Sequence, residues 1–166
     1  MIRRLALALL AAALLLTGCS GSPGEEEPTA GATAAPMDAP PTMPELALDD
    51  SPAGAEAFVR HWVDVFNAAA RSGEGEWLER LSSPNCSPCK SYAREFQKLA
   101  DEERSPSTAI WSLKADHMEA FEDGARTFVK APVDVREGET TEQYVFVFYI
   151  AAKGPERMLD ITMEPR

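Results

Sequence analysis

The chain has 166 residues, with 16 Lys and Arg against 27 Asp and Glu, so its formal net charge at pH 7 is −11. An acidic chain without a basic stripe does not neutralise phosphates, which argues against binding to nucleic acid and to anionic lipid head groups. The sequence also lacks a Gly-rich phosphate loop, a nucleophile elbow and a His-Glu-x-x-His pattern, which argues against the common nucleotide enzymes and hydrolases.

The first 18 residues have the pattern of an export signal. Arg3 and Arg4 precede an unbroken apolar run from Leu5 to Leu16. A helix of that length spans about 18 Å, whereas a bilayer hydrocarbon core is about 30 Å thick. Residues 1–18 are therefore predicted to be a signal peptide that is removed, rather than a permanent membrane span.

The signal ends in Leu16-Thr17-Gly18-Cys19, which resembles the lipobox of bacterial lipoproteins. The resemblance implies cleavage before Cys19, lipid attachment to its thiol, and a place on the outer, extracytoplasmic face of the cell membrane. An ordinary secretory peptide with an accidental cysteine is the alternative. Because one acyl chain gives only marginal membrane binding, at least two chains, such as palmitate, are expected.

Residues 19–50 are predicted to be a disordered tether. This stretch is rich in Pro and Ala and has no aromatic residue, so it cannot build a core. As a coil it would span roughly 30 Å on average. The remaining residues, 51–166, are enough for one small domain and too few for two.

Three helices are predicted in the first half of this domain. The first begins with Ser51 as its N-cap and continues to Gly73, with apolar residues at steps of three and four. A short second helix covers about 74–81, and a third starts near Ser87 or Pro88 and ends before Ser105. The solvent-facing side of the first helix is expected to carry a polar stripe formed by His61, Asp64 and Asn67.

The second half has a period of two and is predicted to form four antiparallel strands. The first covers 111–116, and the second, 129–136, follows a hairpin signal at Asp123-Gly124. The third, 143–152, is apolar on both faces, so it is expected to be central and covered on both sides. The last strand covers 157–163.

The order of these elements, the size of the domain and the aromatic first helix resemble the NTF2-like (SnoaL-like) cone. The lipobox, the tether and the stretches Gly54–Arg60 and Pro84–Cys89 are similar to an uncharacterised family of actinobacterial lipoproteins with a CxxC motif. The resemblance implies an α+β fold with N-terminal helices packed on a curved four-stranded antiparallel sheet. Such cones often enclose a pocket, whose expected lining here is Trp62, Tyr92, Trp111, His117 and Phe146.

Cys86-Ser87-Pro88-Cys89 is the local motif with the clearest chemistry, and it allows two interpretations. A CxxC at a helix N-terminus can be a thiol-disulfide site, because free N–H groups stabilise the first thiolate. The strand that leads into such a site in thioredoxins is not predicted here. The preferred interpretation is a structural disulfide formed in an oxidising compartment. A zinc site would need two further ligands, and no metal is expected.

The leading functional hypothesis is a non-enzymatic binding or accessory module of the cell envelope. Its expected partners are the membrane, through the N-terminal lipid, and a small apolar ligand or an envelope protein. Neither a cofactor nor a catalytic residue is predicted. The alternatives are a thiol-disulfide oxidoreductase that uses Cys86 and Cys89, and an NTF2-like isomerase or dehydratase built around His117.

Overall fold

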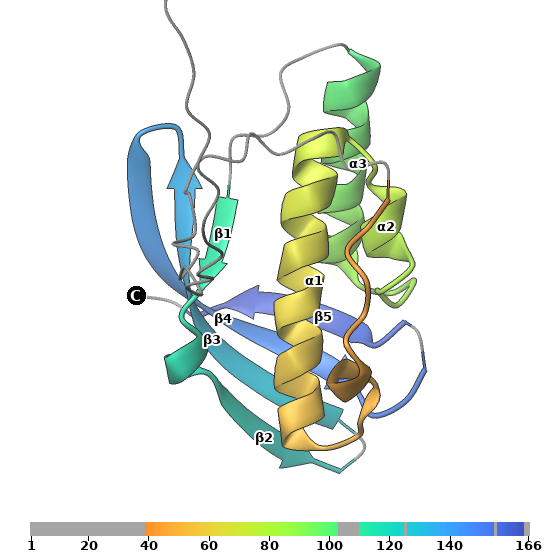
Figure 1. The fold of residues 1–166 in the computed structure, drawn as a ribbon, viewed down its shortest axis with the longest axis vertical. Helices are drawn as coiled ribbons and strands as arrows, with labels where there is room; N and C mark the ends of the chain where they lie inside the picture. The colour runs from red at the N-terminus through yellow and green to blue at the C-terminus, as the bar shows by residue number, and fades with distance from the viewer. Residues whose placement is uncertain (1–38, 103–109, 125, 155, 165–166) are drawn as a thin grey trace, which may run out of the picture. The chain divides into compact units, whose positions relative to one another are not determined.

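The computed structural model describes residues 39–102, 110–124, 126–154 and 156–164. The expected signal peptide, Cys19 and most of the expected tether lie outside these ranges. Within them, helices come first and an antiparallel sheet follows, which confirms the predicted α+β class (Figure 1). None of the described helices has the length and hydrophobicity needed to cross a membrane.

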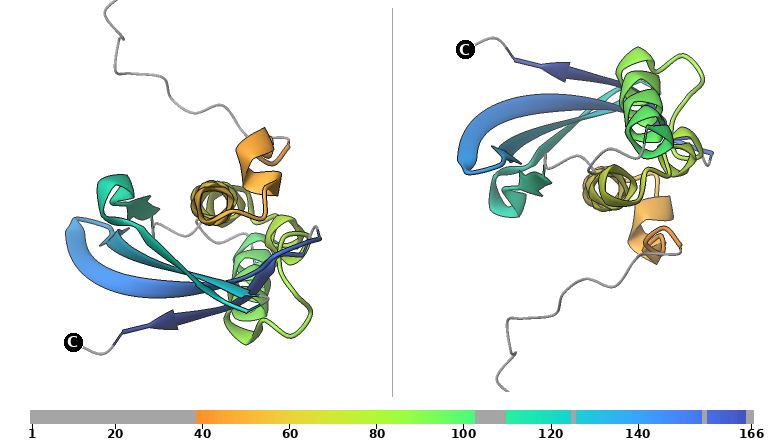
Figure 2. Two further views of the ribbon diagram at one scale, coloured as in Figure 1. Left: turned by 90° about the horizontal axis from the view of Figure 1, so that it is seen from below. Right: turned by 90° about the horizontal axis from the view of Figure 1, so that it is seen from above.

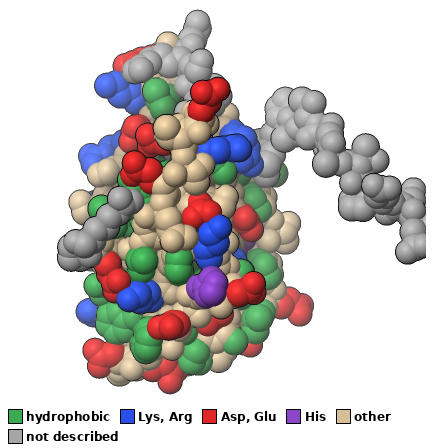
Figure 3. All heavy atoms as spheres, turned by 90° about the vertical axis from the view of Figure 1, so that its left-hand side faces the viewer, with side chains coloured by type: hydrophobic (Ala, Val, Ile, Leu, Met, Phe, Trp, Pro, Cys, Tyr) green, Lys and Arg blue, Asp and Glu red, His purple; other side chains and the backbone are tan. Residues whose placement is uncertain are grey.

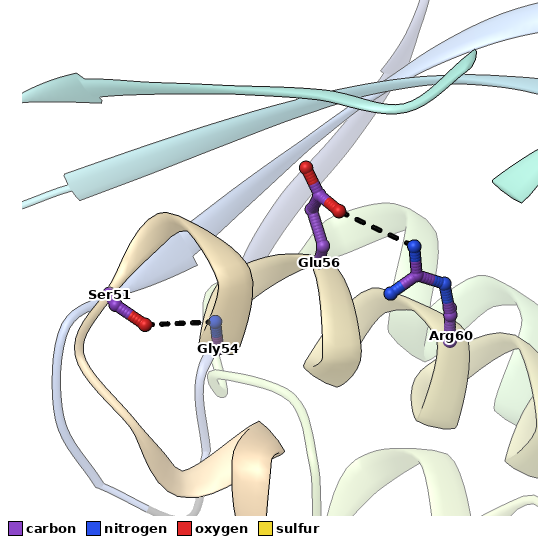
Figure 4. A network of polar contacts seen from close by, with 4 residues as sticks. All are labelled: Ser51, Gly54, Glu56 and Arg60. Atoms are coloured by element: carbon purple, nitrogen blue, oxygen red, sulfur yellow. Dashed lines mark hydrogen bonds and ion pairs between the residues drawn. The ribbon is translucent and has the colours of Figure 1, made fainter. Parts of the chain in front are cut away.

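The first long helix, α1 (Pro52–Ser72), follows the prediction closely. The Ser51 side chain caps it by accepting a hydrogen bond from the backbone N–H of Gly54 at 3.1 Å (Figure 4). Pro52 occupies the first turn, where its missing N–H removes no helical hydrogen bond. The helix ends at Gly73, which has a left-handed φ of 83° that favours glycine.

Two further helices complete the helical half. The second, α2 (Glu76–Glu79), is a single turn and is shorter than the predicted 74–81. The third, α3 (Ser87–Asp101), begins where the sequence predicts. The two helices approach closely at Gly75, where an added Cβ would lie 2.1 Å from the carbonyl oxygen of Ala93. Glycine is therefore required at this crossing.

The sheet has five strands rather than the four predicted: β1 (Ile110–Leu113), β2 (Glu119–Asp123), β3 (Arg126–Glu137), β4 (Thr140–Ala151) and β5 (Met158–Met163). The order is β1-β3-β4-β5, and β2 pairs with β3 beyond the end of β1. All pairings between these strands are antiparallel. A single parallel bridge between Ser82 and Met158 joins the loop after α2 to β5.

The strand missed by the prediction is β2, and the first predicted strand is too long. Apart from Ala120, the side chains of β2 are exposed, so its sequence shows no apolar alternation from which a strand could be predicted. It forms because its backbone pairs with β3 in the hairpin that turns near Asp123. Strand β1 ends at Leu113, and a 3-10 turn, Ala115–His117, replaces the rest of the predicted strand.

Strand β4 is internal, as predicted, but helices cover only one of its faces. Phe146, Phe148 and Ile150 are buried beneath α1, whereas Val145 and Val147 on the other face are half-buried. Figure 2 shows α1 end-on within the curve of the sheet. The core therefore lies between α1 and the concave face of the sheet, and its largest fully buried side chains are Trp62, Phe58, Phe66, Phe148, Leu78, Ile150 and Met158.

The packed part of the chain begins before Ser51, the boundary expected from the sequence. A 3-10 helix, η1 (Glu45–Leu48), lies against α1, and Ala47 is fully buried. Arg157, which is 3% exposed, donates from Nη1 to the carbonyl oxygen of Ala47 and from Nε to that of Ala151 at 3.0 Å. This contact requires tertiary structure, so the proline-rich composition of the segment does not indicate it.

Candidate functional site

An aromatic hollow of about 300 Å³ lies between the helices and the sheet near the hairpin that joins β3 to β4. Its volume is at the lower end of the range for small-molecule sites. The lining combines aromatic rings with two carboxylates and contains no Lys or Arg among the described residues. It consists of Phe66, Tyr92, Glu95, Phe96, Trp111, Val135, Glu137, Tyr144, Phe146 and Met163.

Three parts of the fold bring these side chains together. Tyr92, Glu95 and Phe96 share one side of α3 because they are three and four residues apart on a helix. Phe66 reaches the same space from α1, and Trp111 reaches it from β1. The β3–β4 hairpin and β5 supply the remaining residues. The hollow is thus formed only when helices and sheet dock.

The rings at the base of the hollow form one packed cluster. Phe66 lies 4.4 Å from Trp111 and 5.1 Å from Tyr92 between ring centroids. Trp111 stacks on Phe146 at 4.6 Å with an interplanar angle of 25°. Tyr92 stands at 84° to both Phe66 and Trp111, so it forms a wall perpendicular to this base. Phe66, Trp111 and Phe146 are buried, and Tyr92 and Tyr144 are half-buried at the rim.

Trp111 is held in place by Asn67 of α1. The Asn67 Nδ2 donates to the carbonyl oxygen of Trp111 at 2.8 Å, and the Trp111 N–H donates to Asn67 Oδ1 at 2.9 Å. The predicted polar stripe on α1 is therefore only partly solvated: Asn67 faces β1, and His61 is buried at 4% exposure. Asp64 alone is exposed, as expected. Asn67 thus fixes the position of one ring of the hollow.

The charged side chains among the described lining residues of the hollow are both acidic. Glu95 and Glu137 are exposed at its rim, and neither forms an ion pair with a described Lys or Arg. Burial raises the pKa of the Tyr92 hydroxyl, and the neighbouring Glu95 carboxylate raises that pKa further. Figure 3 shows the side of the molecule that faces left in Figure 1, where acidic, basic and hydrophobic side chains are intermixed.

The structure brings three of the five expected pocket residues together: Tyr92, Trp111 and Phe146. Trp62 is fully buried instead, and its Nε1 donates to Ser82 Oγ at 3.2 Å. His117 is exposed in the 3-10 turn because β1 ends before it, and it borders a different hollow together with Lys114 and Lys130. The expected cluster around His117 therefore does not form.

Most of the other lining residues are not among those expected from the sequence. Glu95 and Phe96 could have been found from their helical spacing to Tyr92, the signal that also brings all three together in the structure. Glu137 could not have been found in this way. Its position at the hollow depends on the pairing register of β3 and β4 and on the turn at Gly138. Phe66 is one of the apolar residues spaced three and four apart in the first helix, and that spacing does not indicate that it lines a pocket.

The Sγ atoms of Cys86 and Cys89 lie 1.95 Å apart, at disulfide distance, as the sequence predicts. Cys86 is the N-cap of α3, and its Sγ accepts a hydrogen bond from the Cys89 N–H at 3.3 Å. The two residues are 0% and 1% exposed. Just before them, the Ser83 N–H donates to the carbonyl oxygen of Met158 at 2.7 Å. The pair thus fixes the start of the helix that supplies Tyr92.

A second hollow, of about 330 Å³, lies beside this pair and is bordered by Cys89, Lys90, Ser82, Ser83, Pro84, Glu79 and Glu156. In the described ranges no group of three or more His, Cys, Asp or Glu residues is arranged to hold a metal ion. The cysteines therefore have no further ligand among these residues with which to form a zinc site.

Comparison with known proteins identifies the family of the chain but gives no activity for it. A family model described as "Family of unknown function (DUF6318)" matches residues 27–143. No curated protein matches the chain. A solved NTF2 design, a variant named Rd1NTF2_05, is 13% identical, with 66% of this chain and 99% of that chain covered and a TM-score of 0.44. The chain belongs to the DUF6318 family of unknown function.

Proposed function

We propose that this protein is a lipid-anchored lipoprotein of the cell envelope whose NTF2-like domain binds a small apolar ligand. The observation that carries the proposal is the aromatic hollow at the junction of α1, α3 and the sheet. Concave, mostly apolar sites with a few polar groups are typical of small-molecule binding.

The proposed anchor follows from the sequence. A basic pair, an apolar run and the lipobox ending in Cys19 together favour export and acylation, in an actinobacterial lipoprotein. Between Cys19 and residue 39, where the described structure begins, the Pro- and Ala-rich stretch would act as the tether. An acidic domain on such a tether would sit clear of anionic lipid heads.

The proposed NTF2-like assignment is supported by the arrangement of the elements. Three helices precede the curved antiparallel sheet, and the first of them lies in the concave face (Figures 1 and 2). A hollow at one end of this layer, between helix and sheet, is the place where such a cone would accept a ligand. The helix that follows Cys86 forms one wall of it.

Two alternative functions are less well supported. A thiol-disulfide exchanger needs an attacking or attacked sulfur that its partner can reach, and Cys86 is fully buried. An isomerase around His117 would need that side chain in the hollow, and it is exposed elsewhere. The arrangement of the hollow favours binding over both chemistries.

Filling the hollow tests the proposed binding site. N-phenyl-1-naphthylamine, a neutral apolar fluorophore, is expected to bind the folded chain, with a rise in fluorescence. Val135→Trp places a large ring in the hollow and is expected to abolish this binding. Val147→Trp, on the opposite face of the sheet, is the matched control and is expected to bind normally. Unchanged binding by Val135→Trp, or no binding by the wild type, would contradict the proposal.

The anchor is tested separately by mass spectrometry of the protein from its own host. The expected mass is that of a chain beginning at Cys19 with at least two acyl chains, and Cys19→Ser is expected to leave the chain uncleaved and unacylated. A native chain that retains Met1, or an unmodified residue 19, would refute the anchor without affecting the ligand site.

A further inference from the structure

We propose that the ligand of the aromatic hollow is an organic cation, such as a quaternary or protonated amine joined to an apolar group. This inference rests on the proposed binding function and narrows its ligand class. It is carried by the juxtaposition of aromatic side chains with two carboxylates at the rim, Glu95 and Glu137, in a lining without a described Lys or Arg.

The ring arrangement suits a cation. Tyr92 stands perpendicular to both Trp111 and Phe66, so the rings form a corner and do not all stack flat. Trp111 packs against Phe66 and Phe146 and is 5% exposed, so a cation in the hollow would contact the half-buried rings of Tyr92 and Tyr144. Tyr rings attract cations through the negative potential over their faces, most strongly when the cation is partly desolvated. A neutral apolar ligand would use the same surfaces but would gain nothing from this potential.

The charges around the rim favour the same class. Glu95 lies on α3 and Glu137 at the end of β3, so the carboxylates approach the hollow from two separate elements. Burial and then the neighbouring Glu95 carboxylate raise the pKa of the Tyr92 hydroxyl, as expected where a carboxylate lies close to the ring. Neither carboxylate is paired with a described basic side chain, so none of the described Lys or Arg residues would compete with a bound cation for them. An anionic ligand would meet repulsion from both.

Three water-soluble probes of nearly the same shape separate charge from apolar contact. They are (4-hydroxyphenyl)trimethylammonium, 4-tert-butylphenol and 4-hydroxybenzenesulfonate, measured by titration calorimetry at low salt. The cation is expected to bind about five- to tenfold more tightly than the neutral isostere, a ratio that corresponds to one or two cation–π contacts. The sulfonate is expected to bind most weakly. Added salt is expected to reduce the preference for the cation, because the rim carboxylates are exposed.

A charge-neutral variant provides the second arm. Glu95→Gln combined with Glu137→Gln is expected to reduce severalfold the ratio of the affinity for the cation to the affinity for 4-tert-butylphenol. Glu122→Gln, at an exposed carboxylate of β2 outside the hollow, is the matched control and is expected to keep the full preference.

The outcomes separate the two proposals. Equal or tighter binding of 4-tert-butylphenol or of the sulfonate would overturn the cation inference and leave the apolar binding site standing. An undiminished preference in the double Gln variant would overturn the role of the carboxylates and, with it, the inference. Binding of none of the probes would overturn both the inference and the proposed function.

Discussion

Asn67 bonds both the N–H and the carbonyl oxygen of Trp111, so a side chain of α1 acts as the hydrogen-bonding neighbour of a strand. Among the described strands, β1 pairs only with β3. The amide of Asn67 has one donor and one acceptor side, which match the two backbone groups of a single residue. This contact joins the helix layer to the sheet at the base of the aromatic hollow.

Replacing Asn67 is therefore expected to weaken the domain and the hollow together. Asn67→Leu leaves both backbone groups of Trp111 without their partner and is expected to lower the free energy of unfolding by about 2 kcal/mol. Urea unfolding measures the loss. Asp64→Leu, on an exposed position of the same helix, is the control and should change stability by no more than about 0.5 kcal/mol. Equal effects of the two substitutions would show that the Asn67 contact contributes nothing specific.

Arg157 makes a comparable connection at the other end of α1. Its guanidinium bonds two carbonyl oxygens and lies 5.2 Å above the ring of Phe58, so it fixes η1 to the helix layer. Arg157→Lys removes the planar fork and is expected to cost about 2 kcal/mol of stability. The segment 45–50 should then become sensitive to limited proteolysis.

The control for Arg157 is another basic residue that contacts the same N-terminal segment. Lys153 forms a 3.5 Å ion pair with Asp50, but its side chain is 82% exposed. Lys153→Gln is therefore expected to change stability by less than about 1 kcal/mol and to leave proteolysis unchanged. If Arg157→Lys behaved in the same way, η1 would not depend on the buried guanidinium.

Elements whose signals lie in their own sequence are predicted, and elements that depend on a distant partner are not. The start and end of α1 could be predicted because Ser51, Pro52 and Gly73 act within one or two turns of themselves. Strand β2 could not, because its backbone is stabilised by β3 while its side chains remain in water. The pairing of β2 depends on β3, and no pattern in the sequence of β2 itself indicates it.

The same distinction applies to the candidate site. Tyr92, Trp111 and Phe146 could be assigned to apolar faces from periodicity alone. His61 and Asn67 are expected on the solvent-facing side of the first helix, because helix periodicity does not show that the N-terminal segment and β1 lie against them. The acidic rim of the hollow depends likewise on how α3 meets the hairpin.

The buried His61 is expected to make the stability of the domain depend on pH. Burial lowers the pKa of its imidazole below the ordinary value of 6.5, and the nearby Asp64 carboxylate only partly opposes this. The unfolded chain therefore binds a proton at a higher pH than the folded chain does. The stability from neutral His61 is fully present above about pH 6.5 and is lost as the pH falls below that value towards the lower, folded pKa.

Chemical unfolding at pH 7.5 and pH 5.5 measures this effect. His61→Gln is expected to reduce the loss of stability between the two values relative to the wild type. The chain has two histidines, and the other, His117, is exposed, so His117→Gln is the natural control and should leave the difference unchanged. An unaltered pH dependence in His61→Gln would mean that carboxylates and not His61 cause it.

The disulfide between Cys86 and Cys89 is expected to stabilise the domain modestly and to leave no reactive thiol. Free-thiol titration of the folded, unreduced domain is expected to find neither Cys86 nor Cys89 reactive, because they are bonded and buried. The bond closes a loop of about four residues, for which chain entropy predicts a stabilisation of about 2 kcal/mol. Replacing both cysteines with serine should lower stability by about that amount, and ligand binding should persist where the fold does. Two titratable thiols in air-purified protein would contradict the structural interpretation, because a bond that fixes the start of α3 would then be absent from the native state.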